Sequence, residues 1–381
     1  MKNNKFYTIC VTVLVTAALS LMTASAYYNG KLFIKPGANA KLNAVIGVLE
    51  DYYYGEYNKE KAIESATKAY VASIGDPYTT YLDKEDLKEF NELINSSYCG
   101  IGVAVQNNVE DNTILVVDVF DGSPAKDAGI VEGDVLTKVN GTPFAGEQLE
   151  EATQNIQGEE GTDVVVTVLK KETGNEVDLT ITRKSIQIDS VDSRVLEENI
   201  GYIAISQFAV ETGLEFTRHF DELVEKGIKG LIIDVRDNGG GVTTSLEAVA
   251  DSLLPKGDMI YYTSDKNGKK NYIKSKIDGI TDIPLVVLCN GNSASASEIL
   301  VGAVKDNKRG TIVGEKTYGK GVVQTLLEMT DNTAIKVTIE KYFTPAGNDI
   351  HKKGIEPDVE VKLTDTDTTD VQLEKAIELL K

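Results

Sequence analysis

The chain has 381 residues, of which 41% are hydrophobic, and this length is enough for roughly two or three domains with buried cores. Its formal net charge is -20, from 39 lysine and arginine residues against 59 aspartate and glutamate residues. Because such a surface repels phosphate groups, the composition argues against a nucleic-acid partner.

Residues 1–30 have the pattern of a targeting segment. Lys2 and Lys5 precede an apolar run from Phe6 to Met22, and Ala24-Ser25-Ala26 follows it. The run predicts either a secretory signal peptide or a retained membrane anchor, since its length is close to the minimum for crossing a bilayer. The basic end favours the anchor, with the body of the protein outside the cytoplasm. We therefore expect an extracytoplasmic protein that is membrane-anchored or secreted.

The cysteines and histidines form no metal or disulfide pattern. Cys10 lies in the leader, while Cys99 and Cys289 fall in segments that we assign to different domains, where we expect buried thiols. The two histidines, His219 and His351, are far apart in the sequence and belong to no HExxH motif. The sequence therefore predicts no zinc site and no cofactor.

Residues 37–95 are predicted to form a small helical unit. Apolar residues recur with helical spacing from Leu42 to Tyr53 and from Ala62 to Tyr70, and Gly75-Asp76-Pro77 ends the second helix. Asp83 can cap a third helix. The unit is too short for a large core, so it either braces the rest of the chain or joins two copies into a homodimer.

Residues 96–184 change to a strand-rich pattern. Two helices are expected among the strands, a short one after Ser123-Pro124 and a longer one from about Glu147 to Ile156. Short strands are predicted from Ile101 to Val105, Ile114 to Val119, Asp134 to Val139, Val164 to Leu169 and Val177 to Ile181.

This segment resembles a PDZ domain. Consecutive amides in a glycine-rich turn can hold a peptide's terminal carboxylate, and the following strand can accept the peptide as an added strand. The resemblance therefore implies that Gly100, Ile101, Gly102 and Val103 bind C-terminal peptides, although Gly-Ile-Gly alone is also typical of an ordinary tight turn. It rests on Tyr98-Cys99-Gly100-Ile101-Gly102-Val103, Gly122-Ser123-Pro124-Ala125, Ala128-Gly129-Ile130, Gly133-Asp134 and Asn140-Gly141.

Residues 185–363 alternate strands and helices, which predicts an α/β core. Ile200 to Ile205 and Leu231 to Val235 are near-continuous apolar runs, as expected of strands that are covered on both faces. In residues 364–381 we expect an acidic linker and a helix with Thr369 and Gln372 as its capping box. Further core elements are predicted as helices around Phe216 to Val224 and Leu246 to Leu253, and as strands near Leu285 to Cys289, Thr311 to Val313, Val322 to Leu327 and Ala334 to Ile339.

A serine-rich turn, Ser293-Ala294-Ser295-Ala296-Ser297-Glu298, lies where a predicted buried strand passes into a helix. A hydroxyl at such a turn is exposed above the sheet, and the first amides of the helix lack helical partners and can hold an oxyanion. The turn is therefore a favoured place for a nucleophile. Each serine could instead cap the helix, and Ser297 is the serine that we expect to do so.

A serine nucleophile needs a base. His219 and His351 lie in no motif, which argues against a histidine triad, whereas a lysine can serve if burial keeps its amine neutral. Lys320 lies between two glycines and leads into a predicted buried strand. The alternative for this lysine is an ordinary solvated turn.

Taken together, these motifs resemble the carboxy-terminal processing (tail-specific) protease family of serine endopeptidases. Ser293 to Glu298, Gly314-Glu315, Gly319-Lys320-Gly321 and Gln324 carry the resemblance. It implies Ser295 as the nucleophile, Lys320 as the general base and Gln324 as the group that orients the lysine amine, whereas Lys316 does not fit the family's spacing.

The resemblance extends to a glycine-rich segment, Asp234-Val235-Arg236-Asp237-Asn238-Gly239-Gly240-Gly241, and to Asp76–Leu82 and Gly354–Asp358. It implies that the amides of Gly241 and Ala296 form an oxyanion hole. A nucleotide-phosphate loop is the rival interpretation, but no Gly-Lys-Ser/Thr follows. One departure is Asn292, where family members commonly carry glycine.

We therefore expect an α/β protease core of the ClpP/crotonase type with an inserted PDZ domain and an N-terminal helical unit. The implied function is a serine endopeptidase that recognises protein C-termini through its PDZ domain and cleaves with a Ser/Lys dyad outside the cytoplasm. The alternative is a non-catalytic PDZ scaffold that binds C-terminal peptides.

Overall fold

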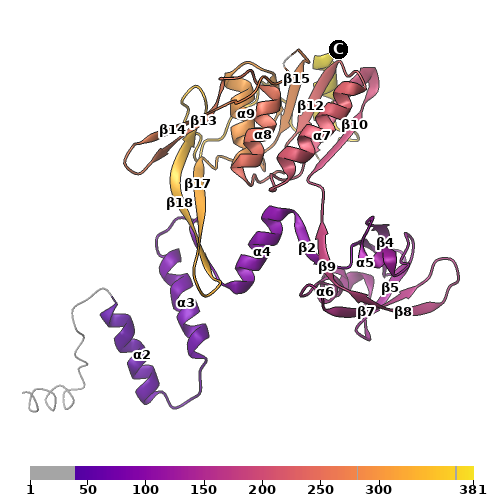
Figure 1. Cartoon of the computed structure of the whole chain (residues 1–381), viewed down its shortest axis with the longest axis vertical. Helices are drawn as coiled ribbons and strands as arrows, with labels where there is room; N and C mark the ends of the chain where they lie inside the picture. The colour runs from indigo at the N-terminus through magenta and orange to yellow at the C-terminus, as the bar shows by residue number, and fades with distance from the viewer. Residues whose placement is uncertain (1–38, 281, 365–366) are drawn as a thin grey trace, which may run out of the picture. The chain divides into compact units, whose positions relative to one another are not determined.

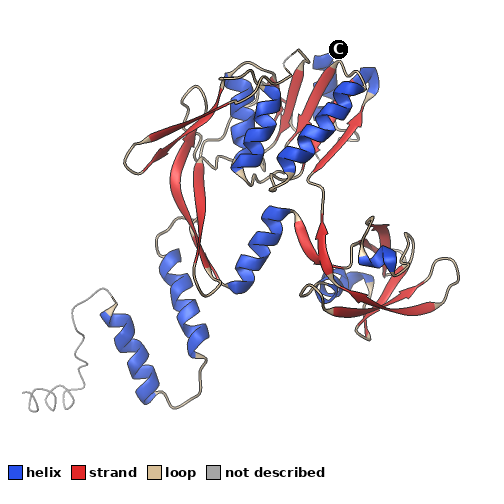
Figure 2. Ribbon diagram, viewed as in Figure 1, coloured by secondary structure: helices blue, strands red, loops and turns tan. Residues whose placement is uncertain are grey.

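A computed structural model describes residues 39–280, 282–364 and 367–381. The chain divides between Thr67 and Lys68 into two compact units. Figures 1 and 2 show the helices and strands of the described residues. The predicted leader lies outside the described residues, as does Cys10. In the described ranges no helix is both long enough and apolar enough to cross a bilayer. The predicted domain boundaries stay predictions.

The predicted N-terminal helices are present. Helix α2 spans Ala40–Tyr52 and buries none of its side chains, and helix α3 spans Lys59–Ala72, so it crosses the division between the two units. Helix α4, Lys84–Asn95, begins at Asp83, whose carboxylate accepts the amides of Glu85 and Asp86. The prediction that Asp83 caps this helix is confirmed.

The PDZ segment is an antiparallel sheet in the order β3-β4-β5-β7-β8, closed by helices α5, Pro124–Asp127, and α6, Leu149–Ile156. A single 3₁₀ turn, η1, Gly146–Gln148, precedes α6, and β6, Thr142–Pro143, pairs with β5. The first predicted strand begins two residues later than expected. The five strands are β3 Val103–Asn108, β4 Thr113–Val119, β5 Val135–Val139, β7 Asp163–Leu169 and β8 Glu176–Thr182.

Two short strands frame this domain. Strand β2, Ser97–Gly100, enters it and strand β9, Lys184–Gln187, leaves it, and the two pair antiparallel. Their pairing brings the two chain connections of the domain together. Neither strand has a run of alternating apolar residues long enough to be predicted.

The core sheet has six strands in the order β10-β11-β12-β15-β16-β19. Strand β10 pairs antiparallel and every other pairing is parallel, so the buried apolar runs of β11, β12 and β15 lie side by side. The prediction of an α/β core is confirmed. The strands are β10 Val191–Val195, β11 Ile200–Ile205, β12 Gly230–Asp234, β15 Leu285–Cys289, β16 Thr311–Gly314 and β19 Val359–Glu360.

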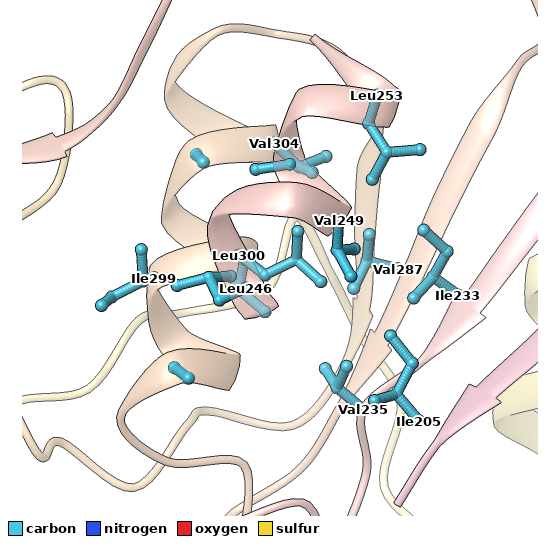
Figure 3. Close-up of a cluster of buried hydrophobic side chains, with 14 of the residues drawn as sticks. Ile205, Ile233, Val235, Leu246, Val249, Leu253, Val287, Ile299, Leu300 and Val304 are labelled. Carbon is cyan, nitrogen blue, oxygen red and sulfur yellow. The ribbon is translucent and has the colours of Figure 1, made fainter. Parts of the chain in front are cut away.

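Helices α7, Thr212–Glu225, α8, Thr243–Leu253, and α9, Ala296–Asp306, cover one face of this sheet (Figure 1). Leu246 and Val249 of α8 pack with Leu300 and Val304 of α9 against strand side chains such as Val287 (Figure 3). Burying these aliphatic side chains stabilises the fold by roughly 1.5–3 kcal/mol each. The ends of the strands beneath α8 and α9 are thereby fixed.

Helix α10, Val371–Leu380, packs on the other face of the sheet. Its cap is Asp370, which accepts the amide of Leu373 at 3.0 Å, so the predicted capping box of Thr369 and Gln372 is wrong. The helix begins one residue later than that box requires. Gln372 instead accepts a hydrogen bond from Arg236, whose guanidinium also binds Asp370 and so fastens α10 to the residues after β12.

A second sheet carries the long strand β18, Ala334–Phe343, which extends beyond the predicted Ile339. Strand β17, Val322–Glu328, pairs along one edge of β18. Strands β1, Thr80–Leu82, and β13, Met259–Asp265, share its other edge, and β14, Lys270–Lys274, pairs with β13. Strands β13 and β14 were not predicted because their sequences mix polar and apolar residues without a clear period.

Both described cysteines are unpaired, as expected, but their burial differs. Cys289 at the end of β15 is fully buried, and burial raises the pKa of its thiol to about 12. Cys99 in β2 is only half-buried, so the expectation of a buried thiol is wrong there, since this strand of a two-stranded sheet lies outside the hydrophobic cores of the PDZ domain and the α/β domain.

Candidate active site

The site is built where two neighbouring parallel strands end. Strand β12 leads into residues 235–241 and strand β15 into residues 290–295. Parallel strands release both turns at the same edge of the sheet. The carbonyl of Asn238 accepts the Ala294 amide at 3.0 Å and the Ser297 hydroxyl at 2.9 Å. The glycine-rich turn and the serine-rich turn, predicted to meet, are therefore held together.

Ser295 occupies the junction between the turn and helix α9. Its φ of 56° and ψ of -114° are strained for a residue with a side chain, as in the sharp turns that expose a nucleophile. In the described part of the chain its hydroxyl has no hydrogen-bond partner. The serine is thus presented at the helix N-terminus with its oxygen free.

Ser297 does not cap helix α9. It is the second residue of the helix, fully buried, and its hydroxyl donates to the Asn238 carbonyl. The prediction was wrong because the helix begins at Ala296, which places Ser297 inside the first turn. Its role is to connect the helix to the glycine-rich turn.

The glycine-rich turn approaches Ser295 so closely that side chains are excluded. Gly240 has a φ of 101°, and a Cβ atom there would lie 2.7 Å from the Cβ of Ser295. Gly241 has a φ of 142°, and its Cβ would lie 2.1 Å from the carbonyl oxygen of Phe208. Across the described ranges, the amides of Gly241 and Ala296 donate to no protein acceptor. Two amides beside Ser295 are therefore available to an oxyanion.

Lys320 lies just before β17 and is half-buried. Burial lowers the pKa of its ammonium, the positive charge of Lys336 lowers it further, and Glu298 opposes the shift. The ammonium lies 5.2 Å from the centre of the Tyr78 ring. Within the described ranges it forms no ion pair. A lysine in these surroundings loses its proton more readily than a solvated one, which is what a general base requires.

Lys316, the competing lysine, is in a different environment. Its ammonium pairs with Glu356 at 2.7 Å, and both side chains are more than half exposed. It does not line the cavity that contains Ser295. The geometry therefore favours Lys320 over Lys316 as the candidate base, as the family spacing also does.

One carboxylate connects the serine and lysine segments. Glu298 is fully buried, and its Oε2 accepts the amides of Ser295 at 3.0 Å and of Lys320 at 2.7 Å. Its Oε1 accepts the Gly319 amide and the Thr317 hydroxyl, each at 2.7 Å. Four donors to one buried carboxylate hold the two turns in a fixed relation.

Gln324 was expected to orient the Lys320 amine. In this structure its side-chain amide donates to the carbonyl of Val322 at 3.1 Å. The pairing of β17 with β18 shifts register between Val323 and Gln324, and such a bulge changes the direction of the side chain. The orienting role of Gln324 stays a prediction.

A cavity of about 670 Å³ brings most of these residues together. Gly241, Ser295, Lys320 and Gln324 all line it, while Ala296, the next residue after Ser295, is fully buried. One part of its wall comes from helix α4 and is apolar. That part consists of Phe90, Leu93 and Ile94.

The two histidines lie elsewhere. The Nδ1 atom of His219 is 2.6 Å from the hydroxyl of Ser193, but its Nε2 is 3.2 Å from the guanidinium of Arg218, which can only donate. His219 must therefore donate from Nδ1 to Ser193 and cannot take its proton. Neither His219 nor His351 lines the cavity. The geometry does not support a histidine triad.

Besides Glu298, sequence reasoning gave no role to two further residues that position the site. Asn238 is fully buried, and its side chain joins the Gly240 amide to the carbonyl of Ile205. Tyr342, also buried, donates its hydroxyl to the carbonyl of Ser295 at 3.1 Å. The signal that could have found Asn238 and Glu298 is a polar residue beside a buried run. Tyr342 had no such signal because it lies in an ordinary strand.

The predicted carboxylate-binding loop of the PDZ segment lies between β2 and β3. The carbonyls of Ile101 and Gly102 accept the amides of Ala125 and Phe120, at 2.9 and 3.1 Å. Gly102 has a φ of 81°, and a Cβ there would lie 2.3 Å from the side chain of Ser123. The loop therefore needs glycine at this position, and its peptide-binding role stays a prediction.

No group of three or more His, Cys, Asp or Glu side chains within residues 39–280, 282–364 and 367–381 is arranged to hold a metal ion.

Comparison with known proteins agrees with this geometry. Residues 199–361 match the model of Peptidase family S41, and residues 115–170 match the model of a PDZ domain. The carboxy-terminal processing protease CtpA of Bacillus subtilis (strain 168) is 37% identical over 363 residues, which cover 94% of this chain and 77% of the relative. The chain belongs to the carboxy-terminal processing protease family. It is a serine-type peptidase of family S41 with a PDZ domain.

Other members and solved structures support the same assignment. The carboxy-terminal processing protease CtpB of the same strain is 35% identical over 328 residues, covering 85% of this chain and 68% of the relative. A structure of the photosystem II D1 C-terminal processing protease is 30% identical with a TM-score of 0.51, covering 88% of this chain and 90% of that one. A structure of a putative S41 protease from Bacteroides fragilis is 16% identical with a TM-score of 0.56. The match covers 92% of this chain and 99% of that one, and it supports the fold alone.

Proposed function

We propose that this processing protease cleaves polypeptides with Ser295 as the nucleophile and Lys320 as the general base. The observation that carries the proposal is one cavity that holds both residues, with Ser295 strained and unbonded beside the free amides of Gly241 and Ala296. The depressed pKa of Lys320 supports its role as the base. Among the described residues no hydrogen bond joins the side chains of Ser295 and Lys320, and catalytic contacts of this kind commonly tighten when substrate binds.

The proposed reaction is an acyl transfer in two stages. The Ser295 oxygen bonds to the scissile carbonyl carbon while its proton passes to the Lys320 amine, and the amides of Gly241 and Ala296 hold the oxyanion. The carbon–nitrogen bond then breaks as Lys320 returns the proton to the leaving amine. Water, deprotonated by Lys320, hydrolyses the acyl-enzyme ester, which releases the new C-terminus and restores Ser295.

The test is cleavage of an unstructured polypeptide with an apolar C-terminal tail by the full chain. Ser295→Ala and Lys320→Ala should each lower the rate by at least about 10⁴-fold, because the nucleophile and its base act as a unit. Lys316→Ala is the matched control, since Lys316 is exposed and outside the cavity. Full activity in Ser295→Ala or Lys320→Ala would contradict the dyad.

We propose further that the PDZ loop of residues 100–103 recognises a free C-terminal carboxylate. The glycine-rich turn supports this role, because its amides can converge on an anion. The inactive Ser295→Ala chain should bind a peptide with a free C-terminus more tightly than its C-terminal amide, measured by calorimetry. Gly102→Ala should remove the difference, since its Cβ would meet Ser123. Equal binding of acid and amide by the unaltered loop would argue against carboxylate recognition.

We also propose that residues 1–30 direct the protease out of the cytoplasm, as a retained anchor or a cleaved signal. Homodimer formation through the helical unit is a further proposal, supported by the exposed apolar side chains Leu42 and Val45 of α2. Mass analysis of the N-terminus from membrane and soluble fractions tests the targeting role of residues 1–30. Sedimentation of the full chain, compared with a Leu42→Asp variant, tests the formation of a homodimer.

A further inference from the structure

The cavity contains a second lysine that takes no direct part in the proposed bond-forming and proton-transfer steps. Lys336 of strand β18 lines the cavity with Ser295 and Lys320. In the sheet it lies between Leu326 of β17 and Thr80 of β1. Its ammonium is 5.3 Å from the centre of the Phe90 ring on helix α4, so the side chain reaches the apolar wall of the cavity.

The charge of Lys336 is not balanced by the protein. Among the described residues it forms no ion pair, whereas Lys341 of the same strand pairs with Asp349. Asp237 is the one acidic residue among the described residues that line the cavity, and its carboxylate is bound by the side chains of Asn290 and Asn292.

The surroundings of Lys336 would strengthen its attraction for an anion. Lys336 is partly buried, and Phe90 and Leu326 beside it supply apolar contacts that reduce the local dielectric. A cation–π contact with Phe90 holds the ammonium in place without neutralising it. Lys320 cannot serve the same purpose, because a general base must be neutral to act.

We propose that Lys336 is a specificity residue that binds a carboxylate of the polypeptide lying in the cavity. The proposal rests on the proposed function, because it requires the substrate to occupy the cavity that holds Ser295. The carboxylate comes from a glutamate or aspartate side chain near the scissile bond or from the C-terminus itself. Both sources present the same chemistry to the ammonium.

The experiment uses the full chain and internally quenched peptides built from alanine and valine. One glutamate is moved along the peptide, each peptide has a glutamine twin, and every pair is made with a free and an amidated C-terminus. A charge-assisted hydrogen bond should give the acidic member of one pair a kcat/KM about 10- to 100-fold higher than its twin. If the glutamate peptide is cleaved faster than its glutamine twin, the bound carboxylate belongs to a side chain. If the peptide with a free C-terminus is cleaved faster than its amidated form, the bound carboxylate is the C-terminus.

The variants separate the charge of Lys336 from its packing. Lys336→Gln should bring the ratio of acidic to neutral substrate close to one, while Lys336→Arg should keep it. Lys336→Glu should reverse the preference towards peptides with lysine at the same position. The matched control is Lys341→Gln, which removes a lysine of the same strand outside the cavity and should leave the ratio unchanged.

The results also distinguish this proposal from the proposed function. The protease mechanism stands if wild type cleaves the peptides and Ser295→Ala does not. In that case the role of Lys336 is overturned if wild type shows no preference for the acidic peptides, or if the preference survives in Lys336→Gln. If Ser295→Ala cleaves as fast as wild type, both are overturned. If the Arg variant retains the preference that the Gln variant loses, the role is supported without depending on how well either variant folds.

Discussion

The carboxylate of Glu298 accepts the backbone amides of both Ser295 and Lys320, at 3.0 and 2.7 Å. One buried side chain on the first turn of α9 thus sets the relation between the two residues that we propose as nucleophile and base. Because the contacts are to the backbone, Glu298 acts by positioning and not by proton transfer.

Glu298→Gln should therefore impair both folding and catalysis. The side-chain NH2 group of the glutamine would replace one carboxylate oxygen and would face N–H or O–H donors. At least two buried donors would then be left unsatisfied. The expected loss in the free energy of unfolding is about 2–5 kcal/mol, measured by urea denaturation, with a fall in kcat/KM that exceeds the fall in folded fraction. Glu356→Gln, at an exposed glutamate, is the control. Unchanged activity in a folded Glu298→Gln variant would contradict the positioning role.

The pH dependence of cleavage should reflect the ionisation of Lys320. Burial and Lys336 depress the pKa of Lys320 from its usual 10.5, with Glu298 opposing and the Tyr78 ring nearby. Since the neutral amine is the active form, kcat/KM should rise with pH and level off above this depressed pKa.

Removing the charge of Lys336 should move this profile. Lys336→Gln takes away a positive neighbour, so the pKa of Lys320 should rise and the increase in kcat/KM should occur at higher pH. Lys341→Gln, on the same strand, should not move it. A profile that is identical in wild type and Lys336→Gln would show that the two ammonium groups do not interact.

Gly241→Ala should inactivate the enzyme and destabilise it. The added Cβ would lie 2.1 Å from the carbonyl of Phe208 at a φ of 142°, so the turn and its amide must move. We expect a loss of about 2 kcal/mol or more in unfolding free energy and about 10²-fold or more in kcat. Gly239→Ala is the stability control, because its Cβ would meet nothing within 4 Å. Equal thermal stability of the two variants would argue against the close approach.

Asn292, where family members commonly carry glycine, should stabilise the site through Asp237. Its side chain donates to the Asp237 carboxylate at 2.8 Å, which bridges the serine-rich and glycine-rich turns. A double-mutant cycle of Asn292→Gly and Asp237→Ala should give a coupling free energy of about 0.5–1.5 kcal/mol in urea unfolding. Additive effects of the two changes would mean that the bridge contributes nothing in solution.

The sequence was sufficient for the features that depend on local pattern. The apolar runs of Ile200 to Ile205 and Leu285 to Cys289 predicted buried parallel strands, because strands covered on both faces show little alternation. Asp83 predicted a helix start, because capping needs only neighbouring residues. The spacing of Ser295 and Lys320 indicated the family before any geometry was known.

Predictions failed where a distant contact competed with a local one. Ser297 has the chemistry of a helix cap, but the carbonyl of Asn238, 59 residues away in the chain, takes its hydroxyl. Gln372 has the chemistry of a capping box, but Arg236 and the carbonyl of Val361 bind its side chain. In both cases the polar group is buried by the fold and must bond to whatever the fold brings to it.

The sequence by itself determined the family, the parallel core and the candidate nucleophile and base, since these are properties of short motifs and their spacing. Only the tertiary structure decided that Glu298 joins the two turns, that Gln324 bonds to its own strand at a bulge, and that Lys336 lies unpaired in the cavity. Each of these depends on which segments the sheets bring together and on the directions in which their side chains then point. Neither property is encoded within any single stretch of the chain.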